Sequence, residues 1–137
     1  MWAAALRRVL SAAMAAFPGA REFTVEAGRP DTLGGDMLPM LRDMGVGRIS
    51  INPQTLCDET LAAIGRGHTS AQALEAVERA SALGFAHINM DLIMGLPGEG
   101  LKQAEATLRG IAGLAVDNLT IHTLTIKRSS ALHEHLE

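Results

Sequence analysis

The stretch HINMDLIMGLPG, residues 87–98, indicates the fold most directly. Its first eight residues form a nearly continuous apolar run that only Asn89 and Asp91 interrupt, and a Gly-Leu-Pro-Gly turn follows. Such a run is typical of a strand in a parallel sheet that is covered on both faces. We therefore expect a parallel strand from His87 to Met94.

Three more segments have the pattern of strands, at residues 22–27, 48–52 and 119–125, and Pro53 is expected to close the second of these. Apolar residues at helical spacing predict helices at about residues 2–17, 31–44, 58–64, 69–83 and 99–114. Thr69 followed by Gln72 is a capping-box pattern for the fourth helix. This alternation predicts an α/β domain with a parallel sheet of about four strands. Two layouts fit, a doubly wound open sheet and a segment of a (β/α) barrel.

Composition narrows the function classes. The 137 residues fit one domain, with a core at residues 1–130 and a tail at 131–137. The net charge of −3 and the interspersed charges argue against nucleic-acid binding. No apolar run approaches the length of a membrane span, and Arg7 and Arg8 interrupt the alanine-rich start, so we expect a cytoplasmic protein without a signal peptide.

The single cysteine, Cys57, excludes an internal disulfide and cannot hold an iron–sulfur cluster or a zinc ion alone. The spacings of a zinc protease motif, a cysteine pair and a phosphate-binding Walker loop do not occur in the sequence. Therefore no metal ligand and no catalytic residue is assigned from spacing.

Polar residues gather at the predicted strand ends. Parallel strands place their carboxyl ends on one rim, where barrels and doubly wound sheets bind ligands. Burying Glu26 and Asp91 requires partners, which can be a ligand, a cation such as Arg66, or each other. The competing interpretation is that these carboxylates are structural and that other groups of the protein satisfy their hydrogen bonds. The residues that converge on the rim are Glu26, Asn52, Gln54, Asn89, Asp91 and His122.

Several motifs occur together in order: EFTVEAGRPDTL, GVGRISINPQTL, IGRGHT, GFAHINMDLIMGLPGE and LTIHTLTIKRSS. This series resembles the second half of the radical S-adenosylmethionine (SAM) core in the oxygen-independent coproporphyrinogen III dehydrogenase (oxidase)-like family. The resemblance extends from the first helix to about Ser130. It implies four strands of a partial, TIM-like (β/α)₆ barrel.

The resemblance also implies cofactors and a reaction. Members of the family hold a [4Fe-4S] cluster with three cysteines in a CxxxCxxC loop, and cleave SAM to a 5′-deoxyadenosyl radical that abstracts a hydrogen from the substrate. In this branch the substrate is coproporphyrinogen III, which is oxidatively decarboxylated in porphyrin biosynthesis.

Five SAM-contacting positions of the family match residues of this chain: Glu26, Gln54, Arg66, Asp91 and Thr125, the last through its backbone. Carboxylates and carboxamides suit the ribose hydroxyls and the ammonium of SAM, and a bidentate arginine suits its carboxylate.

The cysteine loop and the glycine-rich GGTPT stretch of the family are absent. We therefore expect a fragment that is inactive in isolation, with open sheet edges able to pair with other chains. Three alternatives remain: a structural half-barrel, a haem-chaperone-type relative, and a different barrel enzyme that binds a divalent cation through Glu26 and Asp91.

Overall fold

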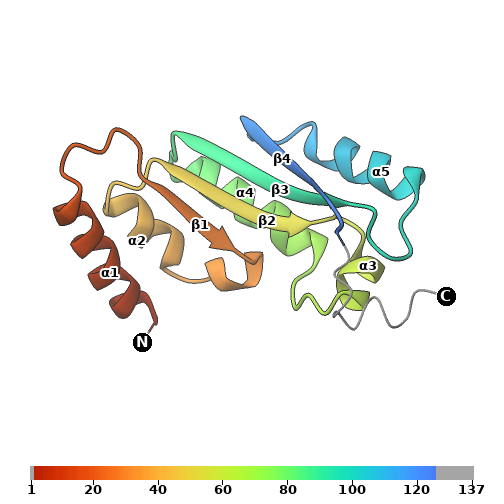
Figure 1. Ribbon diagram of the computed structural model, residues 1–137, viewed down its shortest axis with the longest axis horizontal. Coiled ribbons are helices and arrows are strands. Elements are labelled where there is room, and N and C mark those ends of the chain that lie inside the picture. The colour runs from red at the N-terminus through yellow and green to blue at the C-terminus, as the bar shows by residue number, and fades with distance from the viewer. Residues whose placement is uncertain (1, 126–137) are drawn as a thin grey trace.

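The computed structural model describes residues 2–125 and shows four strands flanked by helices (Figure 1). The strand His87–Met94 has the bounds predicted from the sequence. The elements are α1 (Trp2–Ala16), β1 (Thr24–Gly28), the 3₁₀ helix η1 (Pro30–Leu33), α2 (Met37–Asp43), β2 (Arg48–Gln54), α3 (Asp58–Ala63), α4 (Ser70–Ala82), β3 (His87–Met94), α5 (Leu101–Ile111) and β4 (Asn118–Thr123).

The sheet decides between the two layouts. All three strand pairs are parallel, and the strands lie side by side in chain order, β1-β2-β3-β4. In a doubly wound sheet the strand order reverses at a switch point, whereas barrel strands follow one another in chain order. The α/β class and the parallel barrel-type segment are therefore confirmed.

One face of the sheet forms the core. Ile51 of β2 and Met90 and Leu92 of β3 are fully buried, and they belong to one apolar cluster with Val77 of α4. Figure 1 shows α4 behind the sheet, and no described helix covers the face toward the viewer. Among the described residues a helix therefore covers β3 on one face only. On the other face, where its polar residues lie, Asn89 is buried by neighbouring side chains and Asp91 is partly exposed.

The predicted helix at residues 31–44 is divided. It consists of η1 and α2, because Gly35 between them takes a φ of +59°. This left-handed conformation ends a right-handed helix and is accessible to glycine at little cost. Helix α2 therefore begins only at Met37.

Strand β2 continues two residues past its predicted end. Pro53 lies within the strand because the register against β3 shifts between Ile51 and Gln54. An irregularity of this kind accommodates proline, which has no N–H for the ladder. Gln54 then takes a φ of +74°.

Other boundaries move by a few residues. The capping box at Thr69 and Gln72 is confirmed. Helix α5 is shorter than predicted at both ends, and β4 ends at Thr123 rather than Thr125. The predicted tail at residues 131–137 lies outside the described residues. Within residues 2–125, no helix has the length and apolar character needed to cross a membrane.

Candidate functional site

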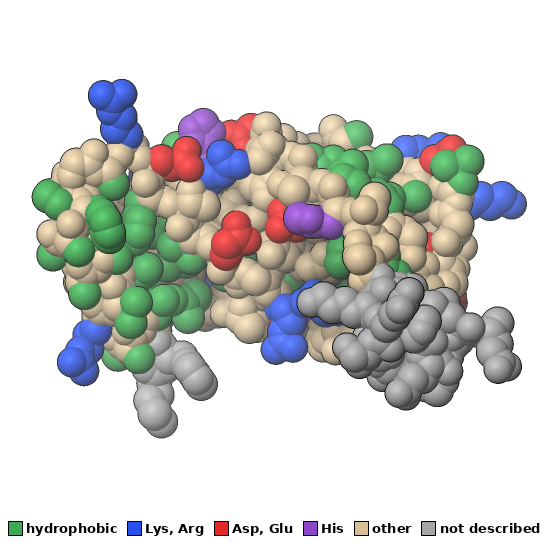
Figure 2. Space-filling model, in the orientation of Figure 1, with side chains coloured by type: hydrophobic (Ala, Val, Ile, Leu, Met, Phe, Trp, Pro, Cys, Tyr) green, Lys and Arg blue, Asp and Glu red, His purple; other side chains and the backbone are tan. Residues whose placement is uncertain are grey.

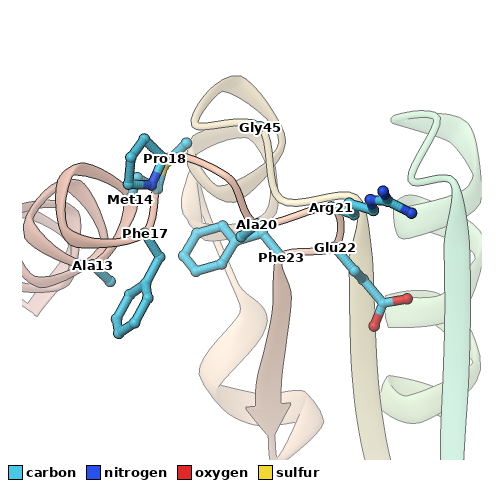
Figure 3. Close-up of a pocket in the computed structure, with 9 residues that line it drawn as sticks. All are labelled: Ala13, Met14, Phe17, Pro18, Ala20, Arg21, Glu22, Phe23 and Gly45. Atoms are coloured by element: carbon cyan, nitrogen blue, oxygen red, sulfur yellow. The ribbon is translucent and has the colours of Figure 1, made fainter.

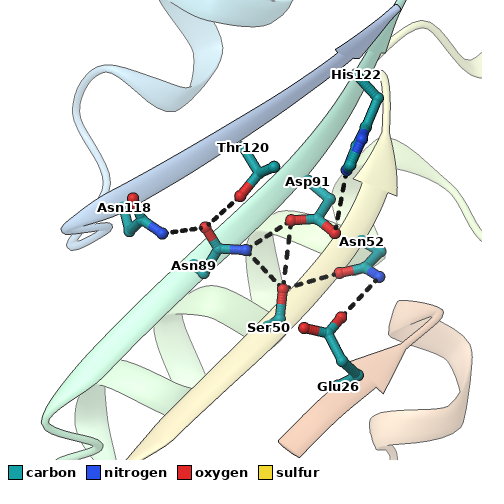
Figure 4. Close-up of polar contacts among 8 residues, drawn as sticks. All are labelled: Glu26, Ser50, Asn52, Asn89, Asp91, Asn118, Thr120 and His122. Carbon is teal, nitrogen blue, oxygen red and sulfur yellow. Dashed lines mark hydrogen bonds and ion pairs between the residues drawn. The ribbon is translucent and has the colours of Figure 1, made fainter. Parts of the chain in front are cut away.

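Polar side chains from all four strands share the open face of the sheet. They follow from strand alternation: on β2 and β3 the residues between them belong to the apolar core, and on β4 they are the exposed Leu119 and Ile121. Figure 2, in the orientation of Figure 1, shows acidic side chains and a histidine over this face. Figure 4 shows the members of this polar face, which are Glu26, Ser50, Asn52, Asn89, Asp91, Asn118, Thr120 and His122.

Asn89 is the hub of the polar face. Its Nδ2 donates to Ser50 Oγ and to Asp91 Oδ1, both at 2.6 Å. Its Oδ1 accepts from Asn118 Nδ2 at 2.8 Å and from Thr120 Oγ1 at 3.1 Å. The buried carboxamide thus uses both donor hydrogens and both acceptor positions, so its orientation is fixed.

Asp91 is held on one side and open on the other. Its Oδ1 accepts from Asn89, while its Oδ2 lies 3.8 Å from His122 Nε2, beyond hydrogen-bonding distance. The Asp91 side chain is 15% exposed and that of His122 is 56% exposed. One carboxylate oxygen is therefore positioned by the protein, and the other retains capacity to accept a hydrogen bond.

Glu26 joins the same face through two intermediates. Asn52 Nδ2 donates to Glu26 Oε2 at 3.4 Å, and Asn52 Oδ1 accepts from Ser50 Oγ at 3.1 Å. The Ser50 hydroxyl also lies 3.4 Å from Asp91 Oδ1, so its one proton serves either acceptor. A continuous polar chain (Figure 4) thus connects the two predicted carboxylates.

The other three predicted positions lie outside this network. Gln54 is the last residue of β2 and is 8% exposed. Arg66 is half-buried in the loop between α3 and α4, and within residues 2–125 it forms no ion pair with Glu26 or Asp91. Thr125 is exposed two residues beyond β4. Amide groups rather than Arg66 are therefore the partners of the carboxylates.

Sequence reasoning missed Ser50, Asn118 and Thr120. Ser50 lies two residues from Asn52 on β2, and Thr120 lies two residues from His122 on β4. Asn118 and Thr120 also lie opposite Asn89 and Asp91 on the neighbouring strand. Extending the period-two pattern along β2 and β4 would have found them.

A hollow of about 410 Å³ lies at the other end of β1, beside the end of α1 (Figure 3). Phe17, Arg21 and Phe23 are among its lining residues, and none of the predicted site residues lines it. Ligands of parallel barrels bind at the carboxyl ends of the strands, so this hollow is not the candidate site.

No group of three metal-ligating side chains lies together among residues 2–125. The lone Cys57 also cannot supply the three thiolates of a [4Fe-4S] cluster. The residues of this chain therefore do not fit a cluster, whereas the open acceptor atoms of the polar face fit a ligand with hydroxyl and ammonium donors.

Comparison with known proteins decides the family. The model of the radical SAM superfamily matches residues 3–111, well over half of the chain. This chain is a member of the radical SAM superfamily. The match spans β1, β2 and β3, which carry Glu26, Gln54 and Asp91.

Curated relatives of the radical SAM chain include a coproporphyrinogen oxidase-like protein and heme chaperones. It is 48% identical over 112 residues to the oxygen-independent coproporphyrinogen-III oxidase-like protein HemZ of Bacillus subtilis, covering 82% of this chain and 22% of the relative. It is 34% identical to the heme chaperone HemW of Bacillus subtilis (85% and 30% covered) and 38% identical to that of Escherichia coli (77% and 28% covered). The chain thus spans less than a third of the length of these relatives.

Solved structures agree with the fold. The coproporphyrinogen III oxidase HemN of Escherichia coli, described as a radical SAM enzyme, matches with a TM-score of 0.73 and 27% identity, covering 79% of this chain and 25% of HemN. The archaeal Elp3 of Methanocaldococcus infernus matches with a TM-score of 0.74 at 20% identity, covering 82% of this chain and 27% of Elp3, which supports the fold alone.

Proposed function

We propose that the polar face is the SAM-binding wall of a radical SAM protein of the coproporphyrinogen oxidase-like branch. The observation that carries this proposal is that two carboxylates lie on the same open face of the sheet and are connected through other polar side chains. Asp91 has one oxygen fixed by Asn89 and one oxygen open, and the exposed Glu26 is connected to it through Asn52 and Ser50. Such acceptors suit the ribose hydroxyls and the ammonium of SAM.

The other proposed contacts complement these acceptors. The Arg66 guanidinium suits the amino-acid carboxylate of SAM, and the Gln54 carboxamide can both donate and accept. Thr125 is proposed to contribute its backbone. In this proposal the residues bind and orient SAM, whose bound form supplies the 5′-deoxyadenosyl group used in the family's chemistry.

A [4Fe-4S] cluster is part of the proposed holoprotein, but its ligands are not. Because the sequence contains one cysteine, we propose that the thiolates lie outside these 137 residues and that the isolated chain is inactive in radical chemistry. The structural half-barrel is the alternative, and it predicts that SAM does not bind the polar face.

For the substrate, we propose a porphyrinogen. Identity supports this choice, since the chain is 48% identical to the coproporphyrinogen oxidase-like relative and 34% and 38% identical to two heme chaperones. Heme transfer is the second candidate, because both chaperone relatives match more than three quarters of this chain. Titration of the intact protein with haem and with coproporphyrinogen III separates them: tight haem binding without turnover of the porphyrinogen favours the chaperone.

The SAM site itself is tested by equilibrium dialysis of labelled SAM against this chain and its Asp91→Asn and Glu26→Gln variants. Each variant preserves side-chain size and removes a charge, and we expect each to weaken SAM binding about tenfold, as expected for one charge-assisted contact. Glu105→Gln is the matched control, because Glu105 lies on α5 and pairs with Arg109. Unchanged affinity in both site variants contradicts the proposal, as does absence of binding to the parent chain.

A further inference from the structure

The turn that follows β2 has an unusual backbone. Gln54, with a φ of +74°, is the one non-glycine residue with a positive φ among the described residues. This conformation is uncommon for a residue with a side chain, and it persists where surrounding structure holds it in place. The question is therefore what holds Gln54.

On the upstream side, His68 holds the preceding peptide. Its Nε2 lies 3.2 Å from the carbonyl oxygen of Pro53, and the imidazole is 3% exposed. Because a carbonyl only accepts, this hydrogen bond requires a proton on Nε2 and does not involve Nδ1. That buried Nδ1 has no hydrogen-bond partner among the described residues. Among the described residues, the ring therefore makes one hydrogen bond, to the Pro53 carbonyl oxygen.

On the downstream side, Thr55 is held by Glu99 and Thr107. The Thr55 hydroxyl donates to Glu99 Oε1 at 2.6 Å, so its single proton is used. The Thr107 hydroxyl, 3.2 Å away, must therefore donate to Thr55 Oγ1, which also accepts from the Cys57 N–H at 3.1 Å. Thr107 Oγ1 in turn accepts from the Leu56 N–H at 3.2 Å.

Helix α5 also contacts this turn. A methyl group placed on Gly110 would lie 2.7 Å from Leu56 Cδ1, so the Leu56 side chain lies directly against α5. Thr55 and Thr107 are 1% and 3% exposed. Three separate segments thus fix the turn: the loop before α4, the turn before α5, and α5 itself.

We infer that His68, Thr55 and Glu99 are positioning residues that hold Gln54 in its left-handed conformation for ligand binding. They act through Gln54, without contact to the ligand. The inference rests on the proposed function, which assigns Gln54 to the SAM site. We call these three residues the clamp. The evidence for the clamp is the positive φ of Gln54, which surrounding contacts must hold in place.

The clamp is tested on this chain by two readouts. The first is the φ of Gln54, obtained from NMR three-bond couplings in Glu99→Ala and Thr55→Val. We expect φ to leave the positive region or to average over both regions in these variants. The conservative variants Glu99→Gln and Thr55→Ser retain the acceptor and the hydroxyl, and we expect them to keep the parent couplings. Glu105→Ala is the charge-matched control on the same stretch of chain. Unchanged couplings in folded Glu99→Ala and Thr55→Val overturn the inference.

The second readout is SAM affinity in a double-mutant cycle. Glu99→Ala should weaken SAM binding about tenfold in the parent chain and have no further effect in the Gln54→Ala background, because it acts through Gln54. Equal losses in both backgrounds indicate a general structural role and overturn the inference. If the parent chain does not bind SAM, the proposed function fails, and the coupling constants decide the clamp on their own.

Discussion

Asn89 Nδ2 donates to Asp91 Oδ1 at 2.6 Å, between two residues that lie two apart on the same face of β3. The spacing places both side chains on one side of the strand, and the buried amide then orients the more exposed carboxylate. A structural residue and a proposed binding residue are thus neighbours on one strand.

Replacing Asn89 by Ala should destabilise the protein by about 2–3 kcal/mol, because four partners lose a buried or partly buried hydrogen bond. Urea denaturation measures the change in the free energy of unfolding. Thr24→Ala is the control, since Thr24 is exposed and its hydroxyl bonds to the nearby Glu22, so a change of less than about 0.5 kcal/mol is expected. Equal effects of the two substitutions would show that the Asn89 network contributes little.

Gly110→Ala should stabilise the protein by less than the helix preference of alanine predicts. The added methyl would meet Leu56 Cδ1 at 2.7 Å, so the end of the Leu56 side chain must shift, which offsets part of the gain of about 1 kcal/mol from helix propensity. Gly113→Ala, just beyond the C-cap of α5, is the control for the methyl group alone, because a methyl there meets nothing within 4 Å. Thermal denaturation measures both variants, and a Gly110→Ala protein that gains the full helix-propensity term contradicts the packing of α5 on the turn.

Thr69→Ala should cost about 1 kcal/mol by removing the capping box at the start of α4. The Thr69 hydroxyl accepts from the Gln72 N–H, and Gln72 Oε1 accepts from the Thr69 N–H. Thr69→Ser retains the first bond and should be nearly neutral. Chemical denaturation measures the free energy of unfolding of both variants. A Thr69→Ser protein that is less stable than the Thr69→Ala protein would contradict this account.

The pair of His87 and Asp117 predicts a pH dependence. A hydrogen bond from the His87 ring, and secondarily one from the Ile88 N–H, lowers the pKa of Asp117 from its ordinary value. A carboxyl whose pKa is lower in the folded state stabilises the fold above its unfolded pKa, and this contribution is lost as the pH falls through the folded pKa. Both side chains are about half exposed, so the contribution is about 0.5 kcal/mol.

Asp117→Asn tests this contribution, because Asn can still accept from the Ile88 N–H. The difference in unfolding free energy between the parent and this variant should be largest near neutral pH and disappear in acid, below the folded pKa of Asp117. A difference that is constant from neutral pH into acid would mean that the charge of Asp117 contributes nothing.

Much of the fold could be predicted because local patterns and tertiary packing agree. In β3, apolar residues alternate with Asn89 and Asp91, and the observed strand has the predicted bounds. The capping box at Thr69 is equally local. The break at Gly35 was missed because apolar residues on both sides keep a helical spacing, while the left-handed backbone interrupts the helix itself.

The candidate site was predicted in part. Glu26 and Asp91 were expected on one rim of the sheet, and Asn52 and Ser50 connect them on its open face. Ser50 was missed although it follows the period-two pattern of β2. Pro53 was taken as a strand end because proline lacks a donor, yet the register shift accommodates it. The fixed turn at Gln54 depends on contacts with residues as distant as Thr107, which no local pattern reveals.

The central claim is that SAM binds the polar face. Its most direct test is an NMR titration of this chain with SAM, with the amide signals of every assigned residue followed. We predict saturable shifts for Glu26, Asn52, Gln54 and Asp91, which Asp91→Asn weakens, and none around the hollow at Phe17 and Phe23. Absence of shifts, or shifts confined to that hollow, would contradict the assignment of the polar face as the SAM site.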